Sequence, residues 1–221
     1  MSVRAALYYA PALNDPLWAA GCGWLGRDPE TAARLPLPAD RDAFTAEPRA
    51  YGFHATLKPP MRLRGTWDSF IASAHALAAR TAPFDLPPLA VADLSGFLAL
   101  RKTAPCPLLH ALAASCVEAV DGFRLPPTDA ELTRRRSAGL SPLQEAMLTR
   151  WGYPYVFDAW RFHMTLTRRL SDAERPAWHA AAAAHFTAAL AVPRRVEDIC
   201  VFAQPGPDQP FTLAERLTLR G

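Results

Sequence analysis

The pentapeptide FHATL at residues 53–57 recurs almost unchanged as FHMTL at residues 162–166. The second copy begins 109 residues after the first in a chain of 221 residues, so the two lie about half a chain apart. With this chain's own residue frequencies, a second copy would arise at random with a chance of roughly 0.2%, which sets it apart from the false matches that short motifs invite. We interpret the repeat as the mark of two related halves that have diverged elsewhere.

Each copy has the alternation of a β-strand with one apolar and one polar face. Successive side chains of a strand point to opposite sides, so His54 and Thr56 project together while their apolar neighbours face the core. The second copy predicts the same for His163 and Thr165. Two such strands, one from each half, would bring two imidazoles and two hydroxyls to one cleft.

The remaining sequence predicts further strands and helices in a similar order in both halves. Pro59 and Pro60 are expected to close the first motif strand, because proline cannot donate to a sheet ladder. Pro176 leaves open where the last helix starts. The predicted strands are 5–10, a short one around residue 54, 84–94, 96–102, 161–167, 195–204 and 211–220; the predicted helices are 14–26, 66–80, 107–122, 129–136, 141–151 and 171–190; a Pro-rich connector lies near 34–40.

We expect an α+β fold in which residues 1–221 form a single bilobed domain. Each half supplies a His-x-Thr strand, a following helix and further strands. Two pseudo-symmetric lobes of antiparallel sheet and helices would then surround a central cleft that the motif strands line.

The composition is that of an ordinary globular protein, with 50% hydrophobic and 20% charged residues. No apolar run approaches the roughly 20 residues that span a bilayer, and the N-terminus lacks the pattern of a secretory signal. The four cysteines contain no C-x-x-C pair, which favours reduced thiols. We expect a soluble cytoplasmic protein without a membrane contact or an obligate protein partner.

The charge pattern favours a phosphate-bearing ligand only weakly. The net charge is +3 and the pI is about 8.8, short of the concentrated basic face of a dedicated nucleic-acid binder. The run of arginines at 134–136 is typical of a solvated face, although it could also bind a distal phosphate of a substrate.

Paired His-x-Thr strands suit the hydrolysis of a phosphodiester. An imidazole has an ordinary pKa of about 6.5, so near neutral pH one histidine can take a proton while the other gives one. A base must activate the attacking water and an acid must protonate the leaving oxygen, while donors hold the non-bridging oxygens. His54 and His163 would be the acid–base pair, in either order, and Thr56 and Thr165 can supply the donors.

The sequence around the motifs offers little to hold a metal ion. Two histidines fall short of the three protein ligands that a catalytic zinc usually keeps, and Asp158 is the only carboxylate near either histidine. We expect a reaction that needs no metal and no other cofactor.

The motifs and their surroundings resemble a known family. The paired segments HATL and HMTL resemble the two signatures of the 2H phosphoesterase superfamily. The segments ALYYAP at 6–11, WLGRD at 24–28, YGFHATLKPP at 51–60 and GYPYVFDAWRFHMTLT at 152–167 are similar to its DUF1045 branch, which is associated with phosphonate metabolism. The resemblance implies a bilobed pseudo-twofold fold, the two histidines as acid and base, the two threonines as phosphate donors and a metal-independent reaction.

The resemblance leaves the substrate open between three alternatives. The association with phosphonate metabolism implies a small ribosyl cyclic phosphate. Better-known members of the superfamily imply RNA instead, as a 2′,3′-cyclic phosphodiesterase or a 2′-5′ RNA ligase. The third alternative is a module that binds a nucleotide or phosphate in the cleft without turning it over.

Three more residues are candidates for substrate binding. The alternation that pairs His54 with Thr56 extends to Lys58, and that of the second strand extends to Arg161. A cation beside a phosphate adds charge stabilisation, although a solvated lysine is equally compatible with the position of Lys58. On the first strand either Tyr8 or Tyr9 faces the cleft, and we take Tyr8 as the candidate.

Overall fold

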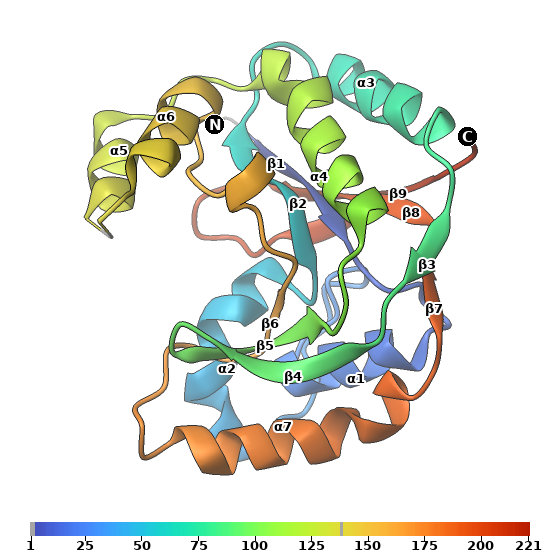
Figure 1. Cartoon of the computed structure of the whole chain (residues 1–221), viewed down its shortest axis with the longest axis vertical. Helices are drawn as coiled ribbons and strands as arrows, with labels where there is room; N and C mark the ends of the chain where they lie inside the picture. The colour runs from blue at the N-terminus through green and yellow to red at the C-terminus, as the bar shows by residue number, and fades with distance from the viewer. Residues whose placement is uncertain (1–2, 138) are drawn as a thin grey trace.

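The computed structural model describes residues 3–137 and 139–221, in which helices pack against antiparallel sheets (Figure 1). Within these residues the main sheet has the strand order β4-β5-β6-β2-β1-β8-β9, and β3 pairs with β7 separately. The predicted α+β class is confirmed. In chain order the elements are β1 (Arg4–Tyr9), α1 (Pro16–Leu25), α2 (Ala39–Tyr51), β2 (Ala55–Arg62), α3 (Trp67–Ala79), β3 (Phe84–Leu86), β4 (Leu89–Leu94), β5 (Phe97–Lys102), α4 (Pro107–Val120), η1 (Asp121–Phe123), α5 (Asp129–Arg136), α6 (Pro142–Trp151), η2 (Phe157–Ala159), β6 (Met164–Thr165), α7 (Arg175–Leu190), β7 (Arg194–Val196), β8 (Asp198–Gln204) and β9 (Thr212–Thr218).

The two motif strands, β2 and β6, are neighbours in the middle of the main sheet. They pair antiparallel at one position, Ala55 with Met164, and this pair joins the β4-β5-β6 part to the β2-β1-β8-β9 part. The motif strands therefore belong to one sheet and lie side by side, where the sequence suggested that they face each other across a gap.

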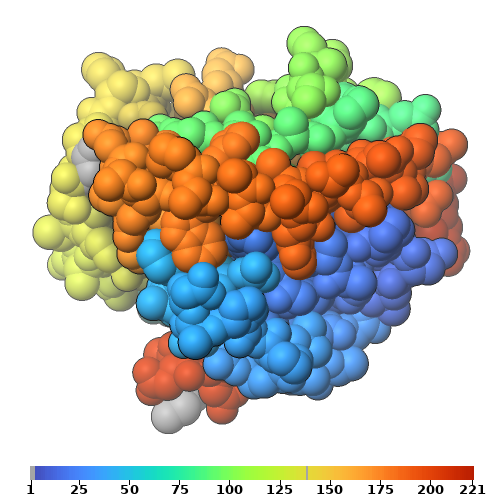
Figure 2. Space-filling model, turned by 90° about the horizontal axis from the view of Figure 1, so that it is seen from below, coloured from blue at the N-terminus to red at the C-terminus, as the bar shows by residue number. Residues whose placement is uncertain are grey.

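Different helices cover the two parts of the sheet. Helix α4 packs on β2 and on α3, and α3 contacts β9. Helix α7 packs against β4, at one edge of the main sheet, and against α1. Figure 2, seen from below, shows α7 in orange lying across this side of the molecule beside the blue N-terminal segments. No helix in the described part of the chain is long and apolar enough to cross a membrane.

One apolar core extends through both parts of the sheet. It contains Leu57 of β2 and Leu166 after β6, together with Phe70 of α3, Leu112 of α4 and Phe186 of α7. The apolar residues of both pentapeptides thus face inward, as their alternation predicted.

Four of the six predicted helices begin with a side-chain cap, whereas α4 and α7 have none, and α7 begins at Arg175 although the sequence predicted its start at residue 171. Asp15 accepts a hydrogen bond from the Leu17 N–H at the start of α1, and Thr66 does the same for Ser69 in α3. Helices α5 and α6 each begin with a reciprocal capping box, at Thr128 and Ser141.

Helix α2 was not predicted. Pro48 lies inside it, and an interior proline normally argues against a helix. Tertiary contacts hold it in place. The buried Arg49 donates from Nε to the Leu25 carbonyl at 2.6 Å and forms an ion pair with Asp42 at 2.8 Å. Helix α2 therefore depends on α1, and it brings the next residues, Gly52 to His54, into position.

The motif strands also differ in length from the prediction. Strand β2 runs through Pro59 and Pro60 to Arg62, whereas β6 comprises only Met164 and Thr165. The prolines are tolerated because they lie in an irregular part of the β1–β2 ladder, and β2 pairs with β6 only at Ala55.

Candidate functional site

The sheet register brings the four motif side chains to one place. Antiparallel pairing of Ala55 with Met164 sets His54 opposite Thr165 and Thr56 opposite His163 when the register is continued by one residue on each side. All four then share the face opposite to the buried pair, and the two histidines are diagonal neighbours, which in a regular ladder lie about 7–8 Å apart.

Both imidazoles are oriented by the same kind of contact. His54 Nδ1 lies 2.8 Å from the Gly52 carbonyl, and His163 Nδ1 lies 2.8 Å from the Arg161 carbonyl, two residues back in each case. A carbonyl only accepts, so each Nδ1 carries the proton and donates it. Each Nε2 therefore keeps a lone pair, and that of His54 lies 3.2 Å from Thr56 Oγ1, whose hydroxyl can donate to it.

Gly52 meets a conformational requirement that no other residue meets easily. Its φ is +83°, and a Cβ atom there would lie 2.8 Å from Pro29 Cβ. Glycine thus allows the chain to turn from α2 into the motif and to present its carbonyl to His54.

Burial favours the neutral form of both histidines. It lowers the pKa of His54 to about 4, against the smaller opposing effect of the Gly52 carbonyl, and a charge on His163 lowers the pKa of His54 further. Burial also lowers the pKa of His163, with an added contribution from the charge of Arg101. The two rings are thus close enough for the charge of one to affect the other.

Tyr8 supports the ring of His54. The two rings stack with centroids 3.7 Å apart and an interplanar angle of 21°. Tyr8 is fully buried, its hydroxyl has no hydrogen-bond partner among the described residues, and burial raises its pKa well above the usual value. A buried hydroxyl without a partner is costly unless a ligand completes it.

Two tryptophans fix the motif strands from the opposite halves of the chain. The Trp24 indole N–H donates to the Leu166 carbonyl at 2.9 Å, next to the second motif's threonine. The Trp160 indole N–H donates to the Thr56 carbonyl at 2.8 Å. Each half therefore anchors the motif of the other.

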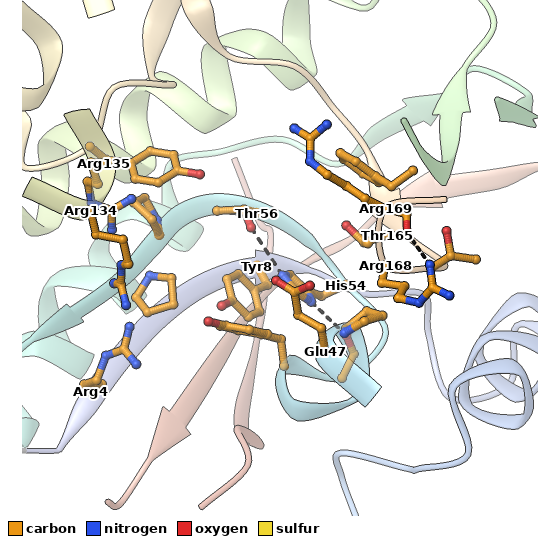
Figure 3. Close-up of a pocket in the computed structure, with 18 residues that line it drawn as sticks. Arg4, Tyr8, Glu47, His54, Thr56, Arg134, Arg135, Thr165, Arg168 and Arg169 are labelled. Atoms are coloured by element: carbon orange, nitrogen blue, oxygen red, sulfur yellow. Dashed lines mark hydrogen bonds between the residues drawn. The ribbon is translucent and has the colours of Figure 1, made fainter. Parts of the chain in front are cut away.

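A cavity of about 800 Å³ opens beside the motif strands. Figure 3 shows His54, Thr56, Tyr8 and Glu47 between two groups of arginines. Five arginines and a single glutamate make the lining strongly cationic, which suits an anionic ligand. The lining residues are Arg4, Tyr8, Glu47, Pro48, Tyr51, Gly52, His54, Thr56, Pro59, Pro60, Phe97, Arg134, Arg135, Tyr153, Thr165, Thr167, Arg168 and Arg169.

The predicted site residues differ in how they relate to this cavity. His54, Thr56, Thr165 and Tyr8 line it, as do two of the arginines in the 134–136 run. His163 lies beside it, with its ring 5.9 Å from that of the lining residue Phe97.

The prediction that Lys58 faces the cleft is wrong. Its side chain is 1% exposed, and its Nζ pairs with Asp121 at 2.9 Å on the α4 side of the sheet. The cause is a register shift in the β1–β2 ladder: Tyr8 pairs with Thr56, but its neighbour Leu7 pairs with Lys58. The extra residue, Leu57, interrupts the alternation on which the prediction was based.

Arg161 is exposed and is not part of the cavity lining. Its contribution to the site is the backbone carbonyl that accepts the proton of His163 Nδ1. A sequence pattern predicts where side chains point in a regular strand, but here the chain enters β6 only at Met164.

Several lining residues were missed from the sequence. Glu47 and Tyr51 lie on the unpredicted helix α2. Arg168 and Arg169 follow the second motif after Thr167, and an arginine pair that begins three residues after the motif threonine is the signal that could have found them. Arg4 and Tyr153 carry no such signal, because only the fold brings them to the cavity.

No cluster of three or more histidine, cysteine or acidic residues in the described part of the chain could hold a metal ion. The cavity lining presents one imidazole together with hydroxyls and guanidiniums, which are groups that bind and polarise a phosphate.

The sequence matches a family model described as "Protein of unknown function (DUF1045)" over residues 56–212. The chain is also similar to two curated proteins, each named ribose 1,5-bisphosphate phosphokinase PhnN. The protein from Janthinobacterium sp. (strain Marseille) is 38% identical over 231 residues, 99% of this chain and 51% of that protein. The protein from Laribacter hongkongensis (strain HLHK9) is 38% identical over 224 residues, 98% of this chain and 52% of that protein. The chain thus spans about half the length of the curated relatives it matches.

Two solved structures can be superposed on the chain over its full length. They are E. coli LigT in its apo form, with 15% identity and a TM-score of 0.49, and a structure described as a phosphoesterase, with 13% identity and a TM-score of 0.48. Each comparison covers 100% of both chains.

Proposed function

The chain belongs to the DUF1045 family of proteins of unknown function, and we propose that it is a phosphodiesterase of the 2H type that hydrolyses a small ribosyl cyclic phosphate. In this proposal His54 and His163 are the general acid–base pair. The hydroxyls of Thr56 and Thr165 hold the oxygens of the reacting phosphate.

The observation that carries the proposal is the matched orientation of the two imidazoles. Each ring has its Nδ1 proton fixed on a carbonyl, so each Nε2 keeps the lone pair with which it can accept or return a proton, and that of His54 lies 3.2 Å from the Thr56 hydroxyl. The two histidines immediately precede the paired strands β2 and β6, and the register of these strands makes them diagonal neighbours, so a phosphate placed between them meets one imidazole on each side. One ring then removes a proton from water, while the other protonates the ribose oxygen as its bond to phosphorus breaks.

The threonine hydroxyls and the arginines fit the charge of the reacting phosphate. Thr56 and Thr165 line the cavity, and Arg168 and Arg169 lie beside Thr165 in Figure 3. Preorganised donors around the non-bridging oxygens stabilise the charge of the transition state without reorganisation.

The preference for a small ribosyl substrate has two supports. The cavity of about 800 Å³ lies within the range of small-molecule sites. The curated relatives carry a name that refers to a phosphorylated ribose, although they are about twice as long as this chain. We therefore propose a ribose derivative as the substrate in preference to RNA.

The decisive experiment measures hydrolysis of a ribosyl cyclic phosphate with EDTA present. The wild-type protein should hydrolyse this substrate, and His54→Ala and His163→Ala should each lower kcat by at least roughly 100-fold. His75→Ala is the matched control, because His75 lies on α3, paired with Glu215 and outside the cavity lining.

Full activity in both site variants would refute the acid–base assignment. Tight binding of cyclic phosphates by the wild-type protein without any turnover would favour a phosphate-binding module instead.

A further inference from the structure

Three arginines gather at the end of the cavity that is farther from the second motif. Arg4 comes from β1, while Arg134 and Arg135 come from α5, more than a hundred residues later in the chain. Figure 3 shows the three side chains together on one side of Tyr8 and His54, with Arg168 and Arg169 on the other side. The fold thus builds a second cationic group at a place separate from the threonines.

These three arginines form no ion pair among the described residues, although Glu131 is near enough to act on the charges of Arg4 and Arg135. Arg168 pairs with Glu174 at 2.9 Å, and Arg136, the third residue of the run, pairs with Glu145 at 2.6 Å. Within residues 3–137 and 139–221, no ion pair involves Arg4, Arg134 or Arg135.

Neutral groups hold two of the three guanidiniums toward the cavity. Arg4 donates to Gln204 Oε1 at 2.8 Å, and the Arg135 guanidinium lies over the Tyr153 ring, 4.6 Å from its centroid. Such contacts orient a charge without neutralising it.

Two buried polar atoms at this end also lack partners. The Nε of Arg135 and the hydroxyl of Tyr8 are both buried, with no hydrogen-bond partner among the described residues. Burial lowers the pKa of Arg135, and the charges of Arg134 and Arg4 lower it further, against the opposing effects of Tyr153 and Glu131. An anion at this position would supply the missing acceptor and relieve the repulsion between the three cations.

We propose that Arg4, Arg134 and Arg135 form a second anion subsite, which binds a phosphate monoester carried by the same substrate. The inference rests on the proposed function, because the first phosphate is the one held between the histidines. A cyclic phosphodiester has one negative charge, whereas a phosphate monoester adds about two more near pH 7. The substrate class is therefore a ribosyl cyclic phosphate with a separate terminal phosphate.

The test compares two ligands that differ only in the distal phosphate: adenosine 2′,3′-cyclic phosphate and its 5′-phosphorylated form. For the wild-type protein kcat/KM should be at least roughly tenfold higher for the 5′-phosphorylated compound, the effect of one or two charge-assisted hydrogen bonds. In the variant R134A/R135A the ratio should fall to about one. Arg136→Ala, the adjacent residue on the same helix, should keep the wild-type ratio.

Two further measurements keep the result unambiguous. The variant R134K/R135K retains both charges and should recover part of the preference, and thermal unfolding of each variant shows whether the fold is intact. The third ligand is a dinucleotide that ends in a 2′,3′-cyclic phosphate but lacks the 5′-phosphate. Relative to adenosine 2′,3′-cyclic phosphate, its kcat/KM should rise less than that of the 5′-phosphorylated mononucleotide. An equal gain would mean that the arginines bind an internucleotide phosphate of RNA, and would overturn the proposal.

Failure of the subsite and failure of the proposed function give different results. Equal hydrolysis of the two mononucleotides by the wild-type protein would refute the subsite and leave the function standing. If neither mononucleotide is hydrolysed, the proposed phosphodiesterase function is refuted. Calorimetric measurement of the binding of the same two ligands then tests the subsite. Tighter, Arg134- and Arg135-dependent binding of the 5′-phosphorylated ligand would support it, and equal binding would refute it.

Discussion

The two imidazoles of the site start from the same protonation state. Their Nδ1 protons are fixed on carbonyls, and burial keeps both rings neutral, with the pKa of His54 at about 4 and that of His163 below its usual value. Acid–base hydrolysis needs one neutral and one protonated ring. A bound phosphate anion raises the pKa of a neighbouring imidazole, so the substrate itself would supply the field that protonates one of them.

This leads to a prediction for the pH dependence of hydrolysis. The ratio kcat/KM reports the free protein, so its optimum should lie below about pH 6.5, the ordinary pKa of histidine. The value of kcat/KM should fall toward higher pH because the protonated ring is lost. It should also fall below about pH 4, because His54 is then protonated as well. The optimum of kcat should lie at higher pH than that of kcat/KM, because the bound phosphate raises the pKa of the neighbouring imidazole. Initial rates between pH 4 and 9 test this, and coinciding optima above pH 7 would contradict it.

Tyr8 allows a prediction that separates binding from stability. Tyr8→Phe keeps the stacking on His54 but removes the buried hydroxyl without a partner. We expect the free energy of unfolding to rise by about 1 kcal/mol and KM to rise roughly fivefold, because the hydroxyl is costly in the empty protein and useful to the ligand. Urea denaturation and steady-state kinetics measure the two effects.

The control for Tyr8 is its neighbour on the same strand. Tyr9 faces the apolar core beside Phe162 and does not line the cavity, so Tyr9→Phe should leave KM unchanged. A Tyr8→Phe variant with unchanged KM would show that its hydroxyl does not contact the substrate.

At the scale of elements, the sequence predicted what depends on local patterns. The helices that begin after Asp15 and Thr66 were predicted, and the alternation around each motif identified the inward face of the strand. It could not predict α2, whose interior Pro48 is outweighed by tertiary contacts, or the irregularity that turns Lys58 away from the cavity. Both depend on residues distant in sequence.

The same reasoning explains which parts of the site were predictable. The four motif residues share a pattern that survives folding, because one residue pair fixes their register. The cationic subsite joins Arg4 of β1 to two arginines of α5, and no spacing in the sequence relates these elements. The run of arginines at 134–136 was visible in the sequence, but whether its side chains reach the cavity depends on where α5 packs.

The tryptophan anchors give a prediction at this scale. Trp160→Phe removes the indole N–H that holds the Thr56 carbonyl and leaves that acceptor without its partner. We expect the free energy of unfolding to fall by about 2 kcal/mol and kcat to fall as well, since β2 positions His54 and Thr56. Chemical denaturation and kinetics provide the readouts.

Trp18→Phe is the matched control for this anchor. Trp18 is also buried, but it belongs to the smaller core cluster around Phe202 and packs under Arg216. The Trp18→Phe variant should have a lower free energy of unfolding but the wild-type kcat. An unchanged kcat in Trp160→Phe would mean that the anchor stabilises the fold without positioning the site.

At the scale of the whole molecule, the site lies where the two parts of the sheet meet. A single backbone pair joins β2 to β6, while the indoles cross from each half to the other and one apolar core extends beneath both. The cavity takes its lining from both parts. Any change that loosens the junction therefore affects both histidines together.

The neutral, half-buried state of His54 makes the stability of the whole protein sensitive to acid. In the unfolded chain its pKa is about 6.5, so between that pH and about 4 the unfolded state binds a proton that the folded state excludes. The contribution of His54 to the free energy of unfolding is fully present above pH 6.5. It is lost as the pH falls toward 4, by up to about 3 kcal/mol. Thermal unfolding should therefore show that wild type loses stability relative to His54→Gln between pH 7 and 4. Comparing the two proteins cancels the titration of the carboxylates they share, and parallel curves would show that His54 becomes charged in the folded protein without cost.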